Sequence, residues 1–272
     1  AVGNVAGTMI TKYLGEASTF GTACSLAACN ALYILLLLPE SLPRGKRRPC
    51  DCVSALPLAS LRLLLRETSG CLGRLCAAQF CAYALFFGFI CNYQIFLQTA
   101  LAFNGSHTAL YIALFSLVSF FTKGSIFHLR KCMSERTLVQ AGFAAFALGC
   151  TTLAAPPLAP AILCASFLMA VGLVVSPCLA SIASSLTPSS QHGAVQALLA
   201  AFAALAEGVG PMLFGVLLAS RVHSELPGLP FLAGAALAVT GLGCALDAMR
   251  RQTTALPLQE HLLPGAIDPI AI

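Results

Sequence analysis

Long apolar stretches alternate with short polar ones along most of the chain. The stretch Phe20–Leu38 holds about 19 residues, enough for a helix to cross the ~30 Å hydrocarbon core of a bilayer. The same pattern predicts eight membrane segments: Ala1–Leu14, Phe20–Leu38, Leu75–Leu101, Thr108–Leu129, Thr137–Ala155, Ala159–Ala183, Ala194–Ala219 and Leu229–Leu246. The sequence therefore predicts an all-α, polytopic (multi-pass) membrane protein.

The composition agrees with this pattern. Charged residues make up 9% of the chain and hydrophobic residues 58%, whereas a soluble domain carries about 25% charged residues. So few charges cannot cover a water-facing surface, and the expected partner is the lipid bilayer. The net charge of +5 is therefore no indication of nucleic-acid binding.

Basic residues set the predicted orientation, because Lys and Arg gather on the cytoplasmic side of membrane proteins. The polar loop Pro39–Arg74 holds the densest group and is placed in the cytoplasm, as is the tail Asp247–Ile272. With alternating sides, 12 of the 15 Lys and Arg residues are cytoplasmic: Arg44, Lys46, Arg47, Arg48, Arg62, Arg66, Arg74, Arg130, Lys131, Arg136, Arg250 and Arg251. The pattern is that of a plasma membrane or an internal membrane alike.

Several classes of site lack their signatures. Most of the 13 cysteines lie in apolar stretches, and Cys50 and Cys52 of the basic loop offer too few ligands for a four-coordinate zinc site. A phosphate-binding loop of the form Gly-x4-Gly-Lys-Ser/Thr is missing, as is a nucleophile–base pair at membrane depth. The sequence thus predicts no metal, no cofactor and no enzyme. Because the chain starts with Ala1 inside an apolar stretch, we expect a fragment of a longer protein.

Five stretches carry a resemblance to a known family. They are Leu38–Pro43, Pro57–Arg62, Gln191–Gln196, Gly208–Gly215 and Leu226–Phe231. In order and spacing they resemble the hippocampus-abundant-transcript-like transporters of the major facilitator superfamily, close to the bacterial tetracycline:proton antiporters. The resemblance runs over nearly the whole chain.

This resemblance implies a fold of twelve helices in two bundles, of which the chain supplies helices five to twelve. Residues 1–38 would be the remnant of the N-terminal bundle, 39–74 the central cytoplasmic loop, 75–251 the complete C-terminal six-helix bundle, and 252–272 a cytoplasmic tail. Some positions depart from the family pattern. Asn4 stands where a proline is expected, Ser134 where a glycine is, and Phe86 and Phe87 where relatives often carry an acidic residue, so the proton chemistry stays open.

Glu207 is the leading candidate for a functional residue, because charges inside membrane segments are costly and point to function by default. It lies roughly 20 Å along its segment, near the midplane, where a carboxyl could titrate with solute or proton binding. The alternative is a neutral glutamate packed between helices. Lys123 lies roughly 9 Å from the cytoplasmic end of its segment, within snorkelling reach of the interface. A Lys123–Glu207 ion pair is not expected.

Polar residues also cluster in the first segment of the predicted C-terminal bundle. Asn92, Gln94 and Gln98 are the candidates for solute binding. Gln94 and Gln98 are four residues apart and share a helix face. A polar face in a membrane helix turns away from lipid, toward a cavity or another helix. Solute binding and interhelical hydrogen bonding both remain open.

A third group is predicted to serve conformational change or packing: Gly208, Gly210, Pro211, Gly215 and, from the Gln-Gly stretch of the resemblance, Gln196. Small residues let helices approach closely, and a proline bends the helix that holds it. This combination suits a rocking interface and tight packing alike. Pro177 is expected to kink the preceding segment in the same way.

A fourth group lies in a tight cytoplasmic turn. It consists of Arg130, Lys131, Glu135 and Arg136. The family resemblance implies a latch whose ion pairs form in one access state. The alternative is charge that only sets the topology.

The sequence thus predicts a secondary transporter that moves a small organic solute by alternating access, with H⁺ as an optional coupling ion through Glu207. The alternative is a non-transporting membrane scaffold or receptor, or a truncated pseudo-transporter.

Overall fold

The structure is a computed structural model that describes residues 2–39, 70–155, 158–188, 191–221, 228 and 230–262. Most of the predicted basic loop, residues 40–69, lies outside the described residues, and so does the end of the tail from residue 263.

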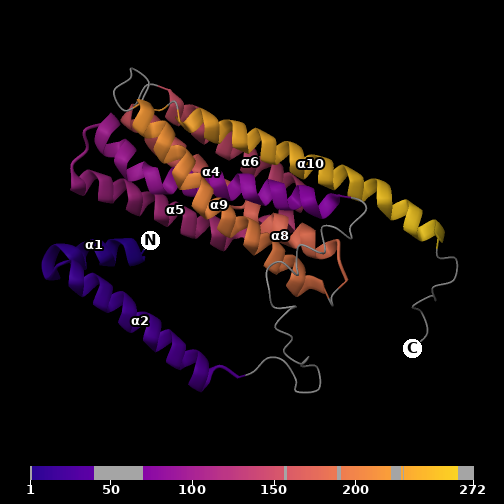
Figure 1. Cartoon of the computed structure of the whole chain (residues 1–272), viewed down its shortest axis with the longest axis horizontal. Coiled ribbons are helices and arrows are strands. Elements are labelled where there is room, and N and C mark those ends of the chain that lie inside the picture. Colours follow the sequence, from indigo (N-terminus) through magenta and orange to yellow (C-terminus); the bar gives the residue numbers. More distant parts are fainter. Residues whose placement is uncertain are drawn as a thin grey trace.

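The described residues form helices and their connections, without a strand. The helices are α1 (Val2–Leu14), α2 (Glu16–Leu37), α4 (Cys71–Ala100), α5 (Gly105–Cys132), α6 (Glu135–Ala154), α7 (Ala159–Gly172), α8 (Val175–Ser185), α9 (His192–Arg221) and α10 (Pro230–Leu262) (Figure 1). By length and composition, seven helical stretches can cross a membrane, with α7 and α8 counted as one. The predicted all-α, polytopic class is confirmed.

Helix α4 is the centre of the bundle. It packs mainly against α9 and α10, while α6 packs against α10 and α7 (Figure 1). Buried aromatic rings join these helices: Phe89 and Phe96 of α4 both meet Phe231 of α10, which also meets Phe214 of α9. The core thus joins α4, the first helix after residue 70, to α9 and α10, which lie more than 90 residues later in the sequence.

Glycines allow the closest of these approaches. A methyl group at Gly210 of α9 would overlap the backbone carbonyl of Ala84 on α4. One at Gly88 of α4 would overlap the ring of Phe214 on α9. The α4–α9 contact therefore brings backbone against backbone, as small residues permit in membrane helix pairs.

The predicted segment Ala159–Ala183 is interrupted. Helix α7 ends at Gly172 and α8 begins at Val175, with the amide of Leu173 bonded to the Ala170 carbonyl at 3.3 Å. Pro177 explains the position of the break, because proline has no N–H for the carbonyl four residues earlier, that of Leu173. In contrast, Pro211 lies inside the continuous helix α9.

Helix α2 extends away from the bundle, which the N-terminal pair of helices meets through α1 (Figure 1). Only Gly15 separates the two helices, and its φ of 84° lies in the left-handed region that favours glycine. Helix α2 begins directly after it at Glu16, four residues before the predicted Phe20. None of the α2 side chains is buried, and α1 contacts α2 and α5. Because these exposed side chains are mostly apolar, a bilayer is the environment that suits them.

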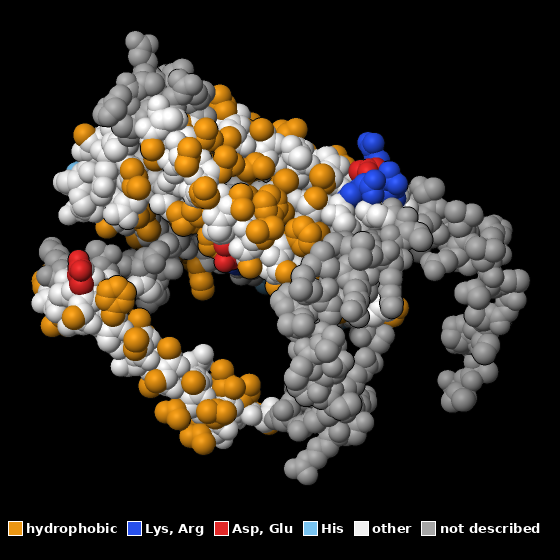
Figure 2. Space-filling model, in the orientation of Figure 1, with side chains coloured by type: hydrophobic (Ala, Val, Ile, Leu, Met, Phe, Trp, Pro, Cys, Tyr) orange, Lys and Arg blue, Asp and Glu red, His pale blue; other side chains and the backbone are white. Residues whose placement is uncertain are grey.

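Charged side chains gather where α10 leaves the bundle (Figure 2). There, Arg74 at the start of α4 forms an ion pair with Asp247 of α10, and Arg251 lies 3.3 Å from the same carboxylate. The start of α4 and the end of α10 are therefore at one end of the bundle, as the predicted alternation requires. Helix α10 also extends past the predicted Leu246 to Leu262, into part of the predicted tail.

Candidate solute site

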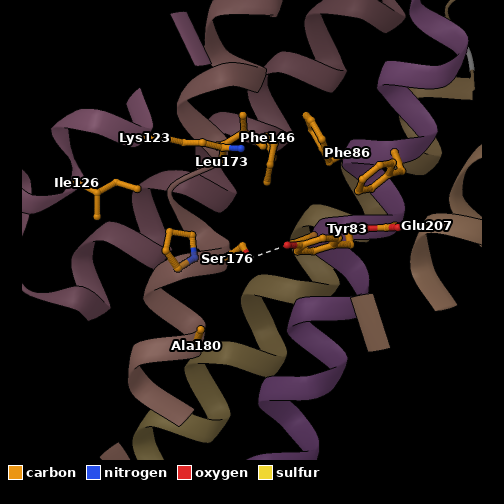
Figure 3. Close-up of a pocket in the computed structure, with 13 residues that line it drawn as sticks. Tyr83, Phe86, Lys123, Ile126, Phe146, Leu173, Ser176, Ala180 and Glu207 are labelled. Atoms are coloured by element: carbon orange, nitrogen blue, oxygen red, sulfur yellow. Dashed lines mark hydrogen bonds between the residues drawn. The ribbon is translucent and has the colours of Figure 1, made fainter. Parts of the chain in front are cut away.

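A half-open cavity of about 480 Å³ lies at the surface of the bundle, where its lining residues Lys123, Pro177 and Glu207 are exposed. Its walls come from α4, α5, α6, α7, α8 and α9 (Figure 3). The lining residues are Ala82, Tyr83, Phe86, Phe87, Lys123, Ile126, Phe146, Gly172, Leu173, Ser176, Pro177, Ala180 and Glu207. Aromatic and apolar surface with a few polar groups is the usual composition of a small-molecule site.

The cavity lies well inside the membrane-spanning part. Lys123 is nine residues before the end of α5, and Glu207 is fifteen after the start of α9. At 1.5 Å per residue these are distances of about 14 Å and about 22 Å from those helix ends. Both positions fall near the middle of a ~30 Å hydrocarbon core.

Glu207 and Lys123 both contribute their side chains to this cavity (Figure 3). Glu207 thus lies about as far along its helix as the sequence predicted. Lys123 lies deeper than expected, because α5 continues to Cys132 rather than ending at Leu129. Within the described part of the chain, the structure records no ion pair or hydrogen bond for either charge.

A short hydrogen-bond chain leads into the cavity. The amide of Gln79 donates to the Ser176 hydroxyl at 2.9 Å, and Ser176 donates to the Tyr83 hydroxyl at 3.2 Å (Figure 3). The Oε1 of Gln79 is buried without a partner among the residues described. Tyr83 and Ser176 were not among the sequence candidates. The available signal was that Tyr83 is four residues after Gln79 and that Ser176 directly precedes the helix-breaking Pro177.

The polar candidates of α4 divide into two groups. Asn92 is buried, and its amide donates to the Gly88 carbonyl at 2.9 Å and to the Pro211 carbonyl of α9 at 3.4 Å. Gln94 and Gln98 are exposed and lie outside the cavity lining. They continue, about two and three turns further along, the α4 face that presents Phe87 to the cavity.

The predicted small-residue group also divides. Gly210 is buried against α4, whereas a methyl at Gly208 would meet nothing within 4 Å. A methyl at Gly215 would lie 3.5 Å from the Asn92 side-chain oxygen, an ordinary contact. The close approach of α9 to α4 is therefore concentrated at Gly210, next to Pro211.

Gln196 of α9 connects this helix to α8 next to the cavity. Its side-chain amide donates to the Ser184 hydroxyl at 2.7 Å and to the Ala180 carbonyl at 3.2 Å, both on α8. Because Ala180 also lines the cavity, Gln196 connects α9 to the α8 wall of the site.

The α5–α6 turn forms a polar cluster with α8. Arg130 pairs with Glu135, and Ser181 of α8 donates to Glu135 Oε1 at 2.8 Å while accepting from Arg130 at 3.2 Å. Ser134 caps α6 by accepting from the Thr137 amide at 3.2 Å, which gives its departure from glycine a structural reason.

This turn holds two other basic residues, Lys131 and Arg136. The ammonium of Lys131 lies 4.5 Å from the centre of the Phe127 ring, and Arg136 is exposed. Of the predicted latch group, the structure therefore brings together Arg130 and Glu135, with Ser181 as a third member that the sequence did not indicate.

This architecture was compared with those of known proteins. No family model matches the chain. The chain resembles, over 94% of its length, the crystal structure of a bacterial homologue of the human lysosomal transporter Spinster in an inward-facing, unoccupied conformation (TM-score 0.57, 14% identity, 65% of that protein covered). The chain has the major-facilitator fold. This confirms the helical-bundle architecture that the resemblance implied.

Relatives by sequence agree with the predicted resemblance. Hippocampus abundant transcript 1 protein of mouse is 24% identical over 232 residues, which are 82% of this chain and 46% of that protein. Human hippocampus abundant transcript-like protein 1 is 22% identical over 265 residues, 88% of this chain and 52% of that protein. The chain spans about half the length of the curated relatives it matches. The tetracycline branch stays a prediction.

Proposed function

We propose that this chain forms the solute-binding part of a secondary transporter that moves a small organic solute by alternating access. The supporting observation is the cavity itself, which combines aromatic walls with two charges, Lys123 and Glu207, that have no ion pair with another described residue. Ionisable groups at that depth are retained where they serve a solute or ion pathway.

The contacts around the cavity are compatible with the conformational change that alternating access requires. The α7–α8 break at Leu173 gives its wall a flexible joint, since discontinuous helices commonly form transporter sites. On the cytoplasmic side, the Arg130–Glu135 pair with Ser181 ties the α5–α6 turn to α8. We propose that this pair, with Lys131 and Arg136 near it, is the latch that opens and closes as access changes.

Accessibility from the two sides of the membrane tests this proposal without knowledge of the solute. A cysteine replaces Ser176 in a chain freed of its own reactive cysteines and is treated with a membrane-impermeant thiol reagent from either side. Alternating access predicts labelling from both sides. A cysteine at Val209, which is exposed on α9 but outside the cavity lining, serves as the control and should resist the reagent. Labelling of position 176 from one side alone would favour the scaffold or receptor.

Proton coupling through Glu207 is a separate part of the proposal. Replacement of Glu207 by Gln keeps the shape of the side chain but removes its titration. We expect Glu207→Gln to abolish the pH dependence of solute uptake into proteoliposomes. If the pH dependence is unchanged, Glu207 is not the coupling group.

A further inference from the structure

We infer that the cavity binds a zwitterionic solute with an apolar, ring-bearing body. Lys123 of α5 and Glu207 of α9 would contact its anionic and cationic groups, and the aromatic residues would hold the body between them. The inference rests on the proposed function for the role of the cavity and adds the chemical class of the solute.

The two charges are the first step. Both line one cavity, and the described residues provide neither with an ion pair or a hydrogen bond. In Figure 3 they enter from different helices, with Lys123 extending toward Leu173 and Glu207 beside the Tyr83 ring. A charge in the membrane interior requires a partner. Here both charges line one cavity and both are exposed in it, so a solute bound there can pair with both.

The sum of these charges selects the class of solute. A solute with a single negative charge would neutralise Lys123 and leave Glu207 unpaired, and a cation would do the reverse. A zwitterion compensates both with one molecule and keeps the loaded cavity neutral. Neutral loading matters in an alternating-access machine, because the loaded site is closed to water on both sides, within the low-dielectric membrane interior, during each cycle.

The walls describe the body of the solute. Rings of Phe86, Phe87 and Phe146 line the cavity, and aromatic pairs favour stacked or edge-on contact with another ring. Tyr83 accepts a hydrogen bond from Ser176, so its own hydroxyl hydrogen can serve an acceptor on the solute. A volume of about 480 Å³ is in the range of drug-sized ligands.

Three probes with one body isolate the effect of charge: the dipeptide Phe-Phe (zwitterion), N-acetyl-Phe-Phe (anion) and Phe-Phe-amide (cation). Binding of radiolabelled Phe-Phe to the chain in lipid nanodiscs is measured, and the capped forms compete with it. Empty nanodiscs correct for partition into lipid. We expect Phe-Phe to bind at least ~10-fold tighter than either capped form, the value of one charge-assisted contact.

The variants assign each charge. Glu207→Gln should remove the advantage of Phe-Phe over the acetylated form and keep its advantage over the amide. Lys123→Gln should do the opposite. Glu16→Gln, an exposed glutamate at the start of α2, is the matched control and should leave all three affinities unchanged. A merely structural role for either residue would weaken the three probes together.

The outcomes separate this inference from the proposed function. Equal affinities for the three probes, tighter binding of a capped form, or no binding to a chain whose folding has been verified would overturn the zwitterion assignment. The two-sided labelling of position 176 could still succeed in those cases. Binding with the expected charge pattern, but without uptake of Phe-Phe into proteoliposomes, would support the assignment and count against transport.

Discussion

Helices α4 and α5 are neighbours in sequence with similar hydropathy, 1.6 in both, but they play different parts in the bundle. Of the most apolar stretch of α4, 61% is buried in the protein, and of α5 only 6%. Only Thr108 and Phe115 are buried on α5. Hydropathy therefore shows that both helices enter the membrane, but does not show which one forms the core.

The difference has a consequence for the cavity between these helices. Its α4–α9 wall is fixed by backbone contact at Gly210, whereas the wall that carries Lys123 belongs to a helix with few buried residues. A site built between a fixed wall and a loosely held one can change shape without disturbing the core. Substitutions that fill space should therefore be harmful on the first wall and harmless on the second.

The largest effect is expected for Gly210→Ala. The added methyl would overlap the Ala84 carbonyl, and because that group is backbone, the helices themselves must separate. We expect a loss of about 3 kcal/mol in unfolding free energy, at the upper end for overpacking. Because the chain has no tryptophan, unfolding is followed by a thiol-reactive dye that reports exposure of the buried cysteines Cys71, Cys76, Cys81, Cys150 and Cys178.

The matched control is Gly208→Ala, two residues away on the same helix. A methyl there meets nothing within 4 Å, so the unfolding midpoint should not fall. If both variants lose the same unfolding free energy, the glycines are needed for flexibility of α9 next to Pro211 and not for the close approach of α9 to α4.

The second largest effect is expected in the core polar pair Tyr93–Ser166, which joins α4 to α7. Both residues are buried, so Ser166→Ala leaves the Tyr93 hydroxyl without this partner, at a cost of about 1–3 kcal/mol. Tyr93→Phe should cost less, because Ser166 keeps its bond to the Ile162 carbonyl at 2.7 Å.

The double variant, Ser166→Ala with Tyr93→Phe, tests this further. Its loss of unfolding free energy should be close to that of Tyr93→Phe alone, since no hydroxyl is then left unpaired. Additive losses, measured with the same dye, would mean that the two hydroxyls contribute independently.

A smaller effect is expected at the Arg130–Glu135 pair of the proposed latch. Glu135→Gln removes the ion pair with Arg130, but both side chains are partly exposed, at 25% and 48%. Exposed pairs contribute up to about 1 kcal/mol, so the unfolding midpoint should drop slightly and less so in high salt. The charge-swapped variant, Arg130→Glu with Glu135→Arg, should recover part of the loss. A drop that salt does not change would assign the role to the Ser181 hydrogen bond instead.

The sequence allowed the membrane helices and the depth of Glu207 to be predicted, because both follow from apolar length and helix rise. The position of the α7–α8 break was not predicted. Pro177 was recognised as a kink, but its effect falls one turn earlier, at the Leu173 carbonyl. The cavity role of Lys123 was missed for a related reason: α5 ends three residues beyond the predicted boundary.

Contacts between distant residues were beyond the reach of a single sequence. Ser176 and Tyr83 are 93 positions apart, and Arg130 and Ser181 are 51 apart. Periodicity places each residue on a helix face, but which faces meet depends on how the helices pack. The exposed Gln94 and Gln98 show the same limit, since their shared face was predicted and its surroundings were not.

The smallest effect is expected for Gly124→Ala on α5, directly after Lys123. A methyl at this position meets nothing within 4 Å, and alanine is favoured over glycine in a helix by about 1 kcal/mol in water. We therefore expect an unchanged or slightly raised unfolding midpoint, in contrast to Gly210→Ala. A clear loss would show that this face of α5 is packed against protein in the membrane, either residues outside the described ranges or a second copy. The loosely held wall would then be a fixed one, and the contrast between α4 and α5 would no longer explain how the cavity changes shape.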